Sequence, residues 1–214
     1  MPDNDCPPSG TSYPSDCEIT QGLRERAAAR TPSPDKGYVW RSCLPKAKPI
    51  KLLLLDVDGV LTDGTITYTH AGDEIKSFHT RDGLGLRLLQ EAGVEVGIIT
   101  ARSSEAVTRR ARDLSLKHVY QGCRNKIEAY NQIMDSLDIS DEEVAYMGDD
   151  WLDLPLMTRV GFAATVADGA PEVKEISHFI TKNPGGRGAV REVCDLIIEA
   201  REMHTTLLNN YLRP

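Results

Sequence analysis

The residues best suited to chemistry are acidic side chains that follow apolar, strand-like runs. Asp56 and Asp58 come directly after the apolar run 52–55, and Asp149 follows the run 144–147. In a parallel α/β sheet, ligands bind beyond the carboxyl ends of the strands, so we expect these carboxylates to lie together. Crowded carboxylates repel one another unless a cation binds among them, and a set of oxygen ligands favours Mg²⁺. The sequence therefore predicts a magnesium site at this edge of a sheet.

Other polar residues fall at related points of the pattern. Thr100 ends a second apolar run, Lys126 begins a later helix, and Asp150 and Asp153 follow Asp149. Each has an ordinary structural explanation. An acid after a strand is often only a turn former or a helix cap, a lone threonine is usually structural, and a lone lysine at a helix start is usually solvated. The combination of acids at two strand ends, a hydroxyl group at another and a lysine favours a functional site over these separate explanations.

The elements that must position these residues alternate between strands and helices from Lys51 onward. The expected strands are 52–55, 94–100, 118–121, 144–147, 162–166 and 179–181. The expected helices are 125–137, 151–159 and 188–200, with two earlier ones capped by Asp82 and by Ser103 or Ser104. A β-hairpin is expected from 65–69 and 74–79 around Ala71-Gly72-Asp73. This order predicts an α/β fold with three layers and a mainly parallel sheet.

The chain divides into three parts by composition. Residues 1–47 are rich in Pro, Ser, Asp and Gly, and we expect a disordered extension there because so polar a segment buries too little surface to offset its ordering entropy. An interaction arm is the alternative. Residues 48–202 form the expected domain, and 203–214 form a C-terminal tail.

Charge and cysteine content narrow the class of protein. The net charge is −7 with no long Lys/Arg run, which argues against a nucleic-acid partner but allows a small anionic substrate at a locally cationic site. The five cysteines are widely spaced and include no CxxC pair, which favours reduced thiols over disulfides or zinc. The sequence has neither an apolar run long enough for a membrane span nor a signal-peptide pattern, so we expect a cytoplasmic protein.

Four segments, in order along the chain, resemble the four motifs of the haloacid dehalogenase superfamily. They are Asp56-Val57-Asp58-Gly59-Val60-Leu61-Thr62, Thr100, Lys126 and Gly148-Asp149-Asp150. The resemblance covers Lys51 to about Ala200 and implies a Rossmann-like core. It also implies that Asp149 binds Mg²⁺ together with the Asp56 carboxylate and the main-chain carbonyl of Asp58.

The same resemblance implies a role for each catalytic side chain. Asp56 would be the nucleophile, Asp58 the general acid and base, Thr100 a hydrogen-bond donor to a phosphoryl oxygen, and Lys126 a balancing charge. These roles are chemically sound, because a carboxylate attacks phosphorus only when the phosphate charge is neutralised, which Mg²⁺ and a lysine supply. An aspartyl-phosphate intermediate divides the reaction into two easier steps. Asp150 and Asp153 would support the site.

The chain has no room for the cap domain that many superfamily members carry. The first insertion point holds only the hairpin segment 62–80, and one helix and one strand fill the segment from Thr100 to Lys126. A member without a cap either accepts a large substrate or completes its pocket by oligomerising.

Further segments resemble the family of 3-deoxy-D-manno-octulosonate 8-phosphate phosphatases. They are 78–83, 120–122, 125–126, 144–150 and Gly185-Gly186-Arg187-Gly188-Ala189-Val190-Arg191-Glu192. This resemblance implies hydrolysis of a small sugar phosphate, the octulosonate (KDO) 8-phosphate, for lipopolysaccharide synthesis. It also implies a homotetramer whose hairpins help to enclose neighbouring pockets. One departure is Ala101, where the family more often has Gly.

Two arginines are candidates for binding the carboxylate of an acidic sugar. Arg81 and Arg187 could each pair with it in bidentate fashion. Lys76 in the hairpin is expected to be an ordinary outward-facing lysine. Three alternatives stay open: a phosphatase for a related acidic sugar such as a nonulosonate 9-phosphate, a phosphomutase, and a non-catalytic binding relative.

Overall fold

The computed structural model describes residues 15–28 and 36–212. Its centre is a six-stranded sheet with strand order β5-β4-β1-β6-β7-β8, in which every neighbouring pair is parallel. The strands are β1 Leu52–Leu55, β4 Glu95–Ile99, β5 His118–Tyr120, β6 Val144–Gly148, β7 Phe162–Thr165 and β8 Phe179–Ile180. The predicted α/β fold with a mainly parallel sheet is confirmed.

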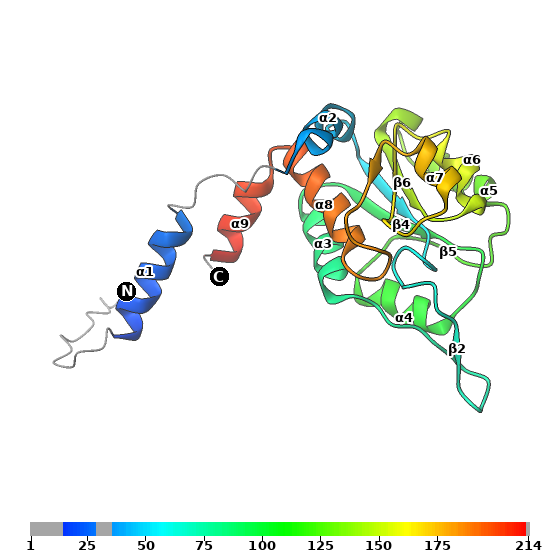
Figure 1. Ribbon diagram of the computed structural model, residues 1–214, viewed down its shortest axis with the longest axis horizontal. Coiled ribbons are helices and arrows are strands. Elements are labelled where there is room, and N and C mark those ends of the chain that lie inside the picture. Colours follow the sequence, from blue (N-terminus) through cyan, green and yellow to red (C-terminus); the bar gives the residue numbers. More distant parts are fainter. Residues whose placement is uncertain (1–14, 29–35, 213–214) are drawn as a thin grey trace.

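Helices cover both faces of this sheet and complete three layers (Figure 1). Buried side chains of α2 Tyr38–Ala47, α3 Thr80–Glu91, α4 Glu105–Asp113 and α8 Ala189–Ala200 pack on one face. Those of α5 Lys126–Met134, α6 Leu154–Met157 and α7 Pro171–Ile176 pack on the other. Successive leucines of β1 point to alternate faces, so this fully buried strand belongs to both cores.

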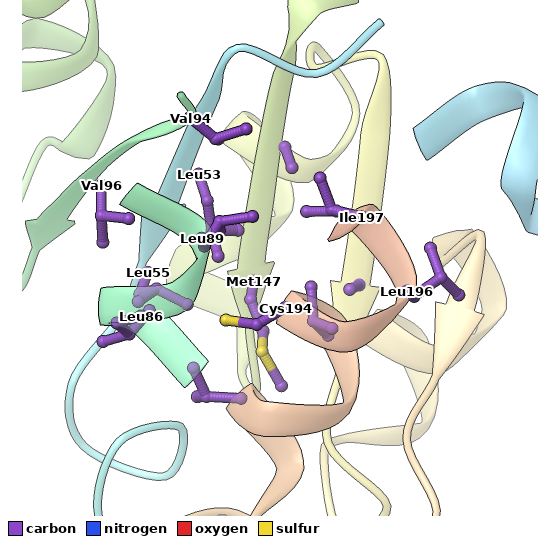
Figure 2. Close-up of a cluster of buried hydrophobic side chains, with 14 of the residues drawn as sticks. Leu53, Leu55, Leu86, Leu89, Val94, Val96, Met147, Cys194, Leu196 and Ile197 are labelled. Carbon is purple, nitrogen blue, oxygen red and sulfur yellow. The ribbon is translucent and has the colours of Figure 1, made fainter. Parts of the chain in front are cut away.

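The larger core joins α3 and α8 to the central strands (Figure 2). Leu86 and Leu89 of α3 and Cys194 and Ile197 of α8 all lie in it and are fully buried. In α8 the buried residues recur at helical spacing, as the predicted stripe requires. Because α3 and α8 share this core, the start of each helix is fixed relative to the carboxyl ends of the strands.

A two-stranded antiparallel hairpin projects from the body near α4 (Figure 1). It consists of β2 Thr67–Tyr68 and β3 Glu74–Ile75, shorter strands than the sequence predicts. Within the described ranges 15–28 and 36–212, the chain forms no cap domain.

The structure departs from the sequence-based expectations in several helices. In place of the single helix expected over 151–159, the chain forms a 3₁₀ turn, η2 Trp151–Asp153, followed by the short α6. The helix α7 was not expected from the sequence. A second 3₁₀ turn, η1 Asp141–Glu143, precedes β6. Asp82 does not cap its own helix α3, whose N-cap residue is His79.

The predicted disordered extension 1–47 needs correction where the structure describes it. Residues 1–14 and 29–35 lie outside the described residues. Residues 16–28 form a helix, α1 Asp16–Ala28, and α2 is part of the folded body because its Trp40 and Cys43 are buried in the larger core. The predicted tail carries a helix as well, α9 His204–Leu212, whose Leu207 is buried. The described parts contain no helix long and apolar enough to cross a membrane.

Candidate active site

Asp56 lies immediately after β1, where the carboxyl end of the central strand meets its neighbours. Its Oδ1 accepts a hydrogen bond of 2.7 Å from the Val57 N–H, and its Oδ2 lies 3.0 Å from Lys126 Nζ. Burial raises the pKa of Asp56 to about 6, although the Lys126 ammonium opposes the shift. The carboxylate is therefore oriented by two partners and is largely ionised above neutral pH.

Lys126 is a buried cation held among acidic groups. Its side chain is 1% exposed, and Nζ lies 2.6 Å from Asp153 Oδ1 and 3.2 Å from the Tyr146 hydroxyl. Burial lowers its pKa, but Asp56 and Asp153 outweigh that effect and raise it, so the lysine stays charged. A buried charge with paired partners is a fixed source of positive potential beside Asp56.

Asp153 organises the loop that follows β6. Its Oδ2 accepts hydrogen bonds from the N–H groups of Asp149 at 2.9 Å and Asp150 at 3.2 Å, while its Oδ1 accepts one of 2.6 Å from the Tyr146 hydroxyl. Because both oxygens are engaged, Asp153 is better placed to support the site than to bind a cation. Asp150 is exposed and caps η2 by accepting from the Trp151 N–H.

The acid cluster suits a cation with oxygen ligands. Asp56, Asp149 and Asp153 present oxygens that all lie within 4.8 Å of one another. The Asp149 Oδ1 atom is buried and has no hydrogen-bond partner. Burial, and then the charges of Asp153 and Asp56, raise the pKa of Asp149 to about 8. An unpaired acidic oxygen among like charges is the environment that a bound Mg²⁺ would neutralise.

The backbone after Asp58 closes tightly on this cluster. Gly59 has a φ of 90°, and a Cβ atom there would lie 2.1 Å from the Asp149 Oδ2 atom. The position therefore requires glycine, both for its left-handed backbone and for the close approach. The Gly59 backbone, directly after Asp58, therefore lies close to the Asp149 carboxylate.

The hairpin contributes charged residues to the same site. The Lys76 ammonium pairs with the Asp58 carboxylate and, at 2.8 Å, with Glu74, and its side chain is 1% exposed. Arg102 Nη2 lies 2.5 Å from Glu74 and Arg102 Nε lies 3.8 Å from Asp58. The expectation of an outward-facing Lys76 was wrong, because this residue follows β3 at the base of the hairpin and its side chain points inward to Asp58.

The remaining predicted residues lie at different distances from the cluster. Thr100 is buried at the end of β4, where its Oγ1 accepts a 3.5 Å hydrogen bond from the Arg102 N–H. Arg187 is exposed and its Nη2 lies 3.4 Å from Asp63 in the loop after Asp58. Arg81 is exposed at the start of α3, and in the part of the chain that the structure describes it forms no ion pair with the acid cluster.

Two residues of the site were not predicted as site residues from the sequence. Tyr146 is fully buried in β6 and its hydroxyl joins Asp153 to Lys126, yet aromatic residues are common in strands and nothing marks this one. Lys76 reads as a strand-edge lysine. A polar group in the otherwise apolar run 144–147 is the one available signal, since buried hydroxyls need partners.

The parallel sheet, the acids at two strand ends and the buried lysine together define a hydrolase of the haloacid dehalogenase type. The model of the haloacid dehalogenase-like hydrolase family matches residues 119–192. The chain is 45% identical over 165 residues to the 3-deoxy-D-manno-octulosonate 8-phosphate phosphatase KdsC of Escherichia coli K12, covering 77% of this chain and 88% of that one. It is 43% identical over 166 residues to KdsC of Yersinia pestis, covering 78% and 89%.

Solved structures agree with these sequence comparisons. The Yersinia pestis enzyme superposes with a TM-score of 0.74 at 44% identity, covering 75% of this chain and 86% of that one. The Moraxella catarrhalis enzyme, solved in complex with magnesium ion, phosphate ion and KDO, gives a TM-score of 0.78 at 41% identity, covering 80% and 98%. The chain belongs to the 3-deoxy-D-manno-octulosonate 8-phosphate phosphatase family.

Proposed function

We propose that this protein is a Mg²⁺-dependent phosphatase that hydrolyses 3-deoxy-D-manno-octulosonate 8-phosphate to KDO and phosphate, a step of lipopolysaccharide synthesis. The observation that carries this proposal is the Asp56 carboxylate, set 3.0 Å from Lys126 and within the same acid cluster as Asp149. The named activity of relatives about 45% identical supplies the substrate.

Asp56 attacks phosphorus in the first step. The Val57 N–H and Lys126 fix the orientation of its carboxylate, and a bond forms from a carboxylate oxygen to phosphorus as the bond to the sugar oxygen breaks. Asp58 donates a proton to that departing oxygen. In the second step, Asp58 takes a proton from the water that attacks the aspartyl-phosphate, which frees Asp56 and phosphate.

The metal would be held by residues of the acid cluster. The carboxylates of Asp56 and Asp149 and the main-chain carbonyl of Asp58 are the proposed ligands, and Asp153 holds the Asp149 backbone in place. A bound Mg²⁺ supplies positive charge that lowers the cost of bringing a phosphate dianion to a carboxylate. Lys126 supplies a second, permanent positive charge from the protein.

Basic residues beside the cluster suit an anionic sugar. A cavity of about 510 Å³ is lined by Arg102 and Arg124, together with Ala101, Ser103 and Leu152. Thr100, one residue before this lining, is the proposed hydrogen-bond donor to a phosphoryl oxygen. Arg81 and Arg187 remain the proposed partners of the sugar carboxylate, and both side chains are exposed.

We propose a cytoplasmic homotetramer. The support for assembly is the absence of a cap within the described residues and the apolar surface of the hairpin, where Ile66, Tyr68 and Ile75 are 44%, 60% and 50% exposed. A neighbouring copy would cover this surface and enclose the open site. The buried thiols of Cys43 and Cys194, which form no disulfide among the described residues, support a reducing compartment.

The test is phosphate release from a panel of sugar phosphates, each with Mg²⁺ and then with excess chelator. We expect fast release from the octulosonate 8-phosphate that stops on chelation. Faster release from a nonulosonate 9-phosphate would replace the proposed substrate by that sugar. Release that is unaffected by the chelator would contradict the metal-dependent mechanism.

A further inference from the structure

A buried carboxylate outside the catalytic cluster joins two helices. Asp82 lies in the first turn of α3 and is 1% exposed. Its Oδ2 accepts a hydrogen bond of 3.2 Å from the Gly188 N–H, and its Oδ1 accepts one of 2.8 Å from the Arg191 N–H. Both donors belong to the N-terminus of α8, whose first N–H groups have no partner within the helix.

Gly188 cannot cap α8 by itself. It is the N-cap residue of that helix, has a left-handed backbone with φ of 107°, and has no side chain to accept a hydrogen bond. A side-chain oxygen at this point commonly accepts from the second or third N–H of the helix. Asp82 supplies that acceptor from the neighbouring helix, so the first turn of α8 depends on a residue that is distant in sequence.

The segment before α8, residues 182–188, is called the strap here. In its middle, the Gly185 N–H donates to Asp168 Oδ1 at 2.9 Å and the Gly186 N–H donates to the Val60 carbonyl at 2.9 Å. A Cβ atom on Gly185 would lie 1.8 Å from the Gly59 carbonyl oxygen. The strap therefore lies directly against the loop 59–62 that follows Asp58.

The two ends of the strap depend on α8. At its start, Glu192 in the first turn of α8 accepts from the N–H groups of Lys182 at 3.0 Å and Asn183 at 2.8 Å. At its end, Asp82 holds Gly188. Since Asp82 also fixes the first turn that contains Glu192, it acts on both ends of the strap. The strap has further contacts that do not involve Asp82, with Asp168 and Val60 in its middle and with Asp63 through Arg187.

We propose that Asp82 is a positioning residue for phosphoryl transfer. It fixes the N-terminus of α8, and α8 holds the strap against the loop 59–62 that directly follows Asp58. This inference rests on the proposed function, in which Asp58 donates a proton to the departing oxygen. When the strap loosens, Asp58 loses its alignment with that oxygen. The attack by Asp56 is affected less, because within the described residues its partners Val57 and Lys126 form no hydrogen bond or ion pair with the strap.

Leaving-group dependence separates this role from a general loss of structure. A misaligned Asp58 slows the cleavage of an ester whose leaving group needs a proton, such as phenyl phosphate. It matters little for p-nitrophenyl phosphate, whose leaving group departs as a stable anion. A variant that is merely less folded slows both esters by the same factor.

The experiment compares kcat/KM for these two esters, with Mg²⁺, in the wild type, Asp82→Ala and Asp82→Asn. For Asp82→Ala we expect a fall of about 10²-fold on phenyl phosphate, the lower end of the range for general acid catalysis, and a fall of at most about tenfold on p-nitrophenyl phosphate. Asp82→Asn keeps the side-chain volume and one acceptor oxygen, which guards against a variant that fails to fold. Asp82→Asn should shift the ratio of the kcat/KM values for the two esters in the same direction as Asp82→Ala, by a smaller factor.

Asp141→Asn is the matched control. The Asp141 carboxylate also joins distant elements, since it accepts 2.7 Å and 2.8 Å hydrogen bonds from Tyr130 and Arg159, but it precedes β6 and lies at the opposite end of that strand from Asp149. We expect this variant to leave the ratio of the two esters unchanged. Equal losses on both esters in the Asp82 variants, or no loss, would overturn the positioning role alone. A wild type that releases no phosphate from these esters or from the octulosonate 8-phosphate would overturn the proposed function and this inference with it.

Discussion

At the scale of the residue, Asp149 is an acid whose carboxylate lies close to those of Asp56 and Asp153. Burial and the charges of Asp153 and Asp56 raise its pKa from 3.8 to about 8. An acid with a higher pKa in the folded state binds protons on folding. The free energy of unfolding of the metal-free protein therefore falls as the pH rises between these two values. A divalent cation at the cluster offsets this loss, most strongly at high pH.

The first prediction concerns Asp149→Asn. Without metal at pH 8, the variant should melt at a higher temperature than the wild type because one of the repelling charges is gone. Mg²⁺ should raise the melting temperature of the wild type, by about 2–4 °C for each kcal/mol of stabilisation in a chain of this length, and leave the variant unchanged. Scanning calorimetry at pH 6 and pH 8 measures both effects.

Asp150, the exposed neighbour of Asp149, provides the control for this prediction. Asp150→Asn removes the same charge next to the site and should keep the full response to Mg²⁺. An equal response to Mg²⁺ in the wild type and in Asp149→Asn would show that Asp149 does not bind the metal.

Several site positions could be predicted because strand ends can be read from the sequence. Asp56, Thr100 and Asp149 each end an apolar run, and parallel strands bring such ends to one edge. Tyr146 and Lys76 could not be found this way. Their contacts depend on which side of β6 faces Lys126 and on the inward direction of Lys76 after β3, and neither is fixed by local periodicity.

At the scale of the element, α2 shows where composition misleads. It follows a polar, proline-rich stretch and contains Pro45, yet it packs on α8 and β8. Trp40 is 7% exposed, meets Phe179 edge-on at 5.8 Å and lies under the Lys36 ammonium at 3.8 Å. A few large side chains are enough to order a segment whose average composition is that of a flexible one.

The second prediction follows from this packing. Trp40→Ala should lower the free energy of unfolding by about 3–5 kcal/mol, as expected for the loss of a buried tryptophan. Val39→Ala, on the exposed side of the same helix, should change it by less than about 0.5 kcal/mol. Urea denaturation followed by circular dichroism measures both. Equal stability of the two variants would mean that α2 does not belong to the folded domain.

Asp82 shows that the local sequence signal for a helix cap also has a limit. The sequence identifies it as a helix cap, and the side chain does cap a helix, but the helix is α8 instead of its own α3. Local signals mark a residue that accepts from helix N–H groups. They do not identify the helix whose N–H groups the side chain caps, because that depends on the packing of α3 against α8.

At the scale of the whole molecule, the site is open and its apolar surroundings are exposed. Ile66 and Ile75 of the hairpin are 44% and 50% exposed, and Trp151 and Leu152, which directly follow Asp150 in sequence, are 62% and 58% exposed. Exposed apolar side chains favour contact with another chain. The proposed tetramer accounts for this surface.

The third prediction tests that assembly. The wild type should have a mass in light scattering of about four times the 23.6 kDa of one chain. Ile66→Asp combined with Ile75→Asp should dissociate it, because buried unpaired charges are costly at an interface. Ile180→Asp, which changes an exposed apolar residue of β8, should leave the mass unchanged. A wild type that is fully active as a single chain would contradict the proposal.

The most direct test of the account is to trap the phosphorylated enzyme. Acid quenching during turnover with Mg²⁺ and the octulosonate 8-phosphate, followed by borohydride, reduces an aspartyl-phosphate to homoserine, which mass spectrometry locates. We predict homoserine at position 56 in the wild type and none in Asp56→Asn, which should be folded and inactive. Phosphate release without modification of Asp56, or modification of another acid, would contradict the mechanism.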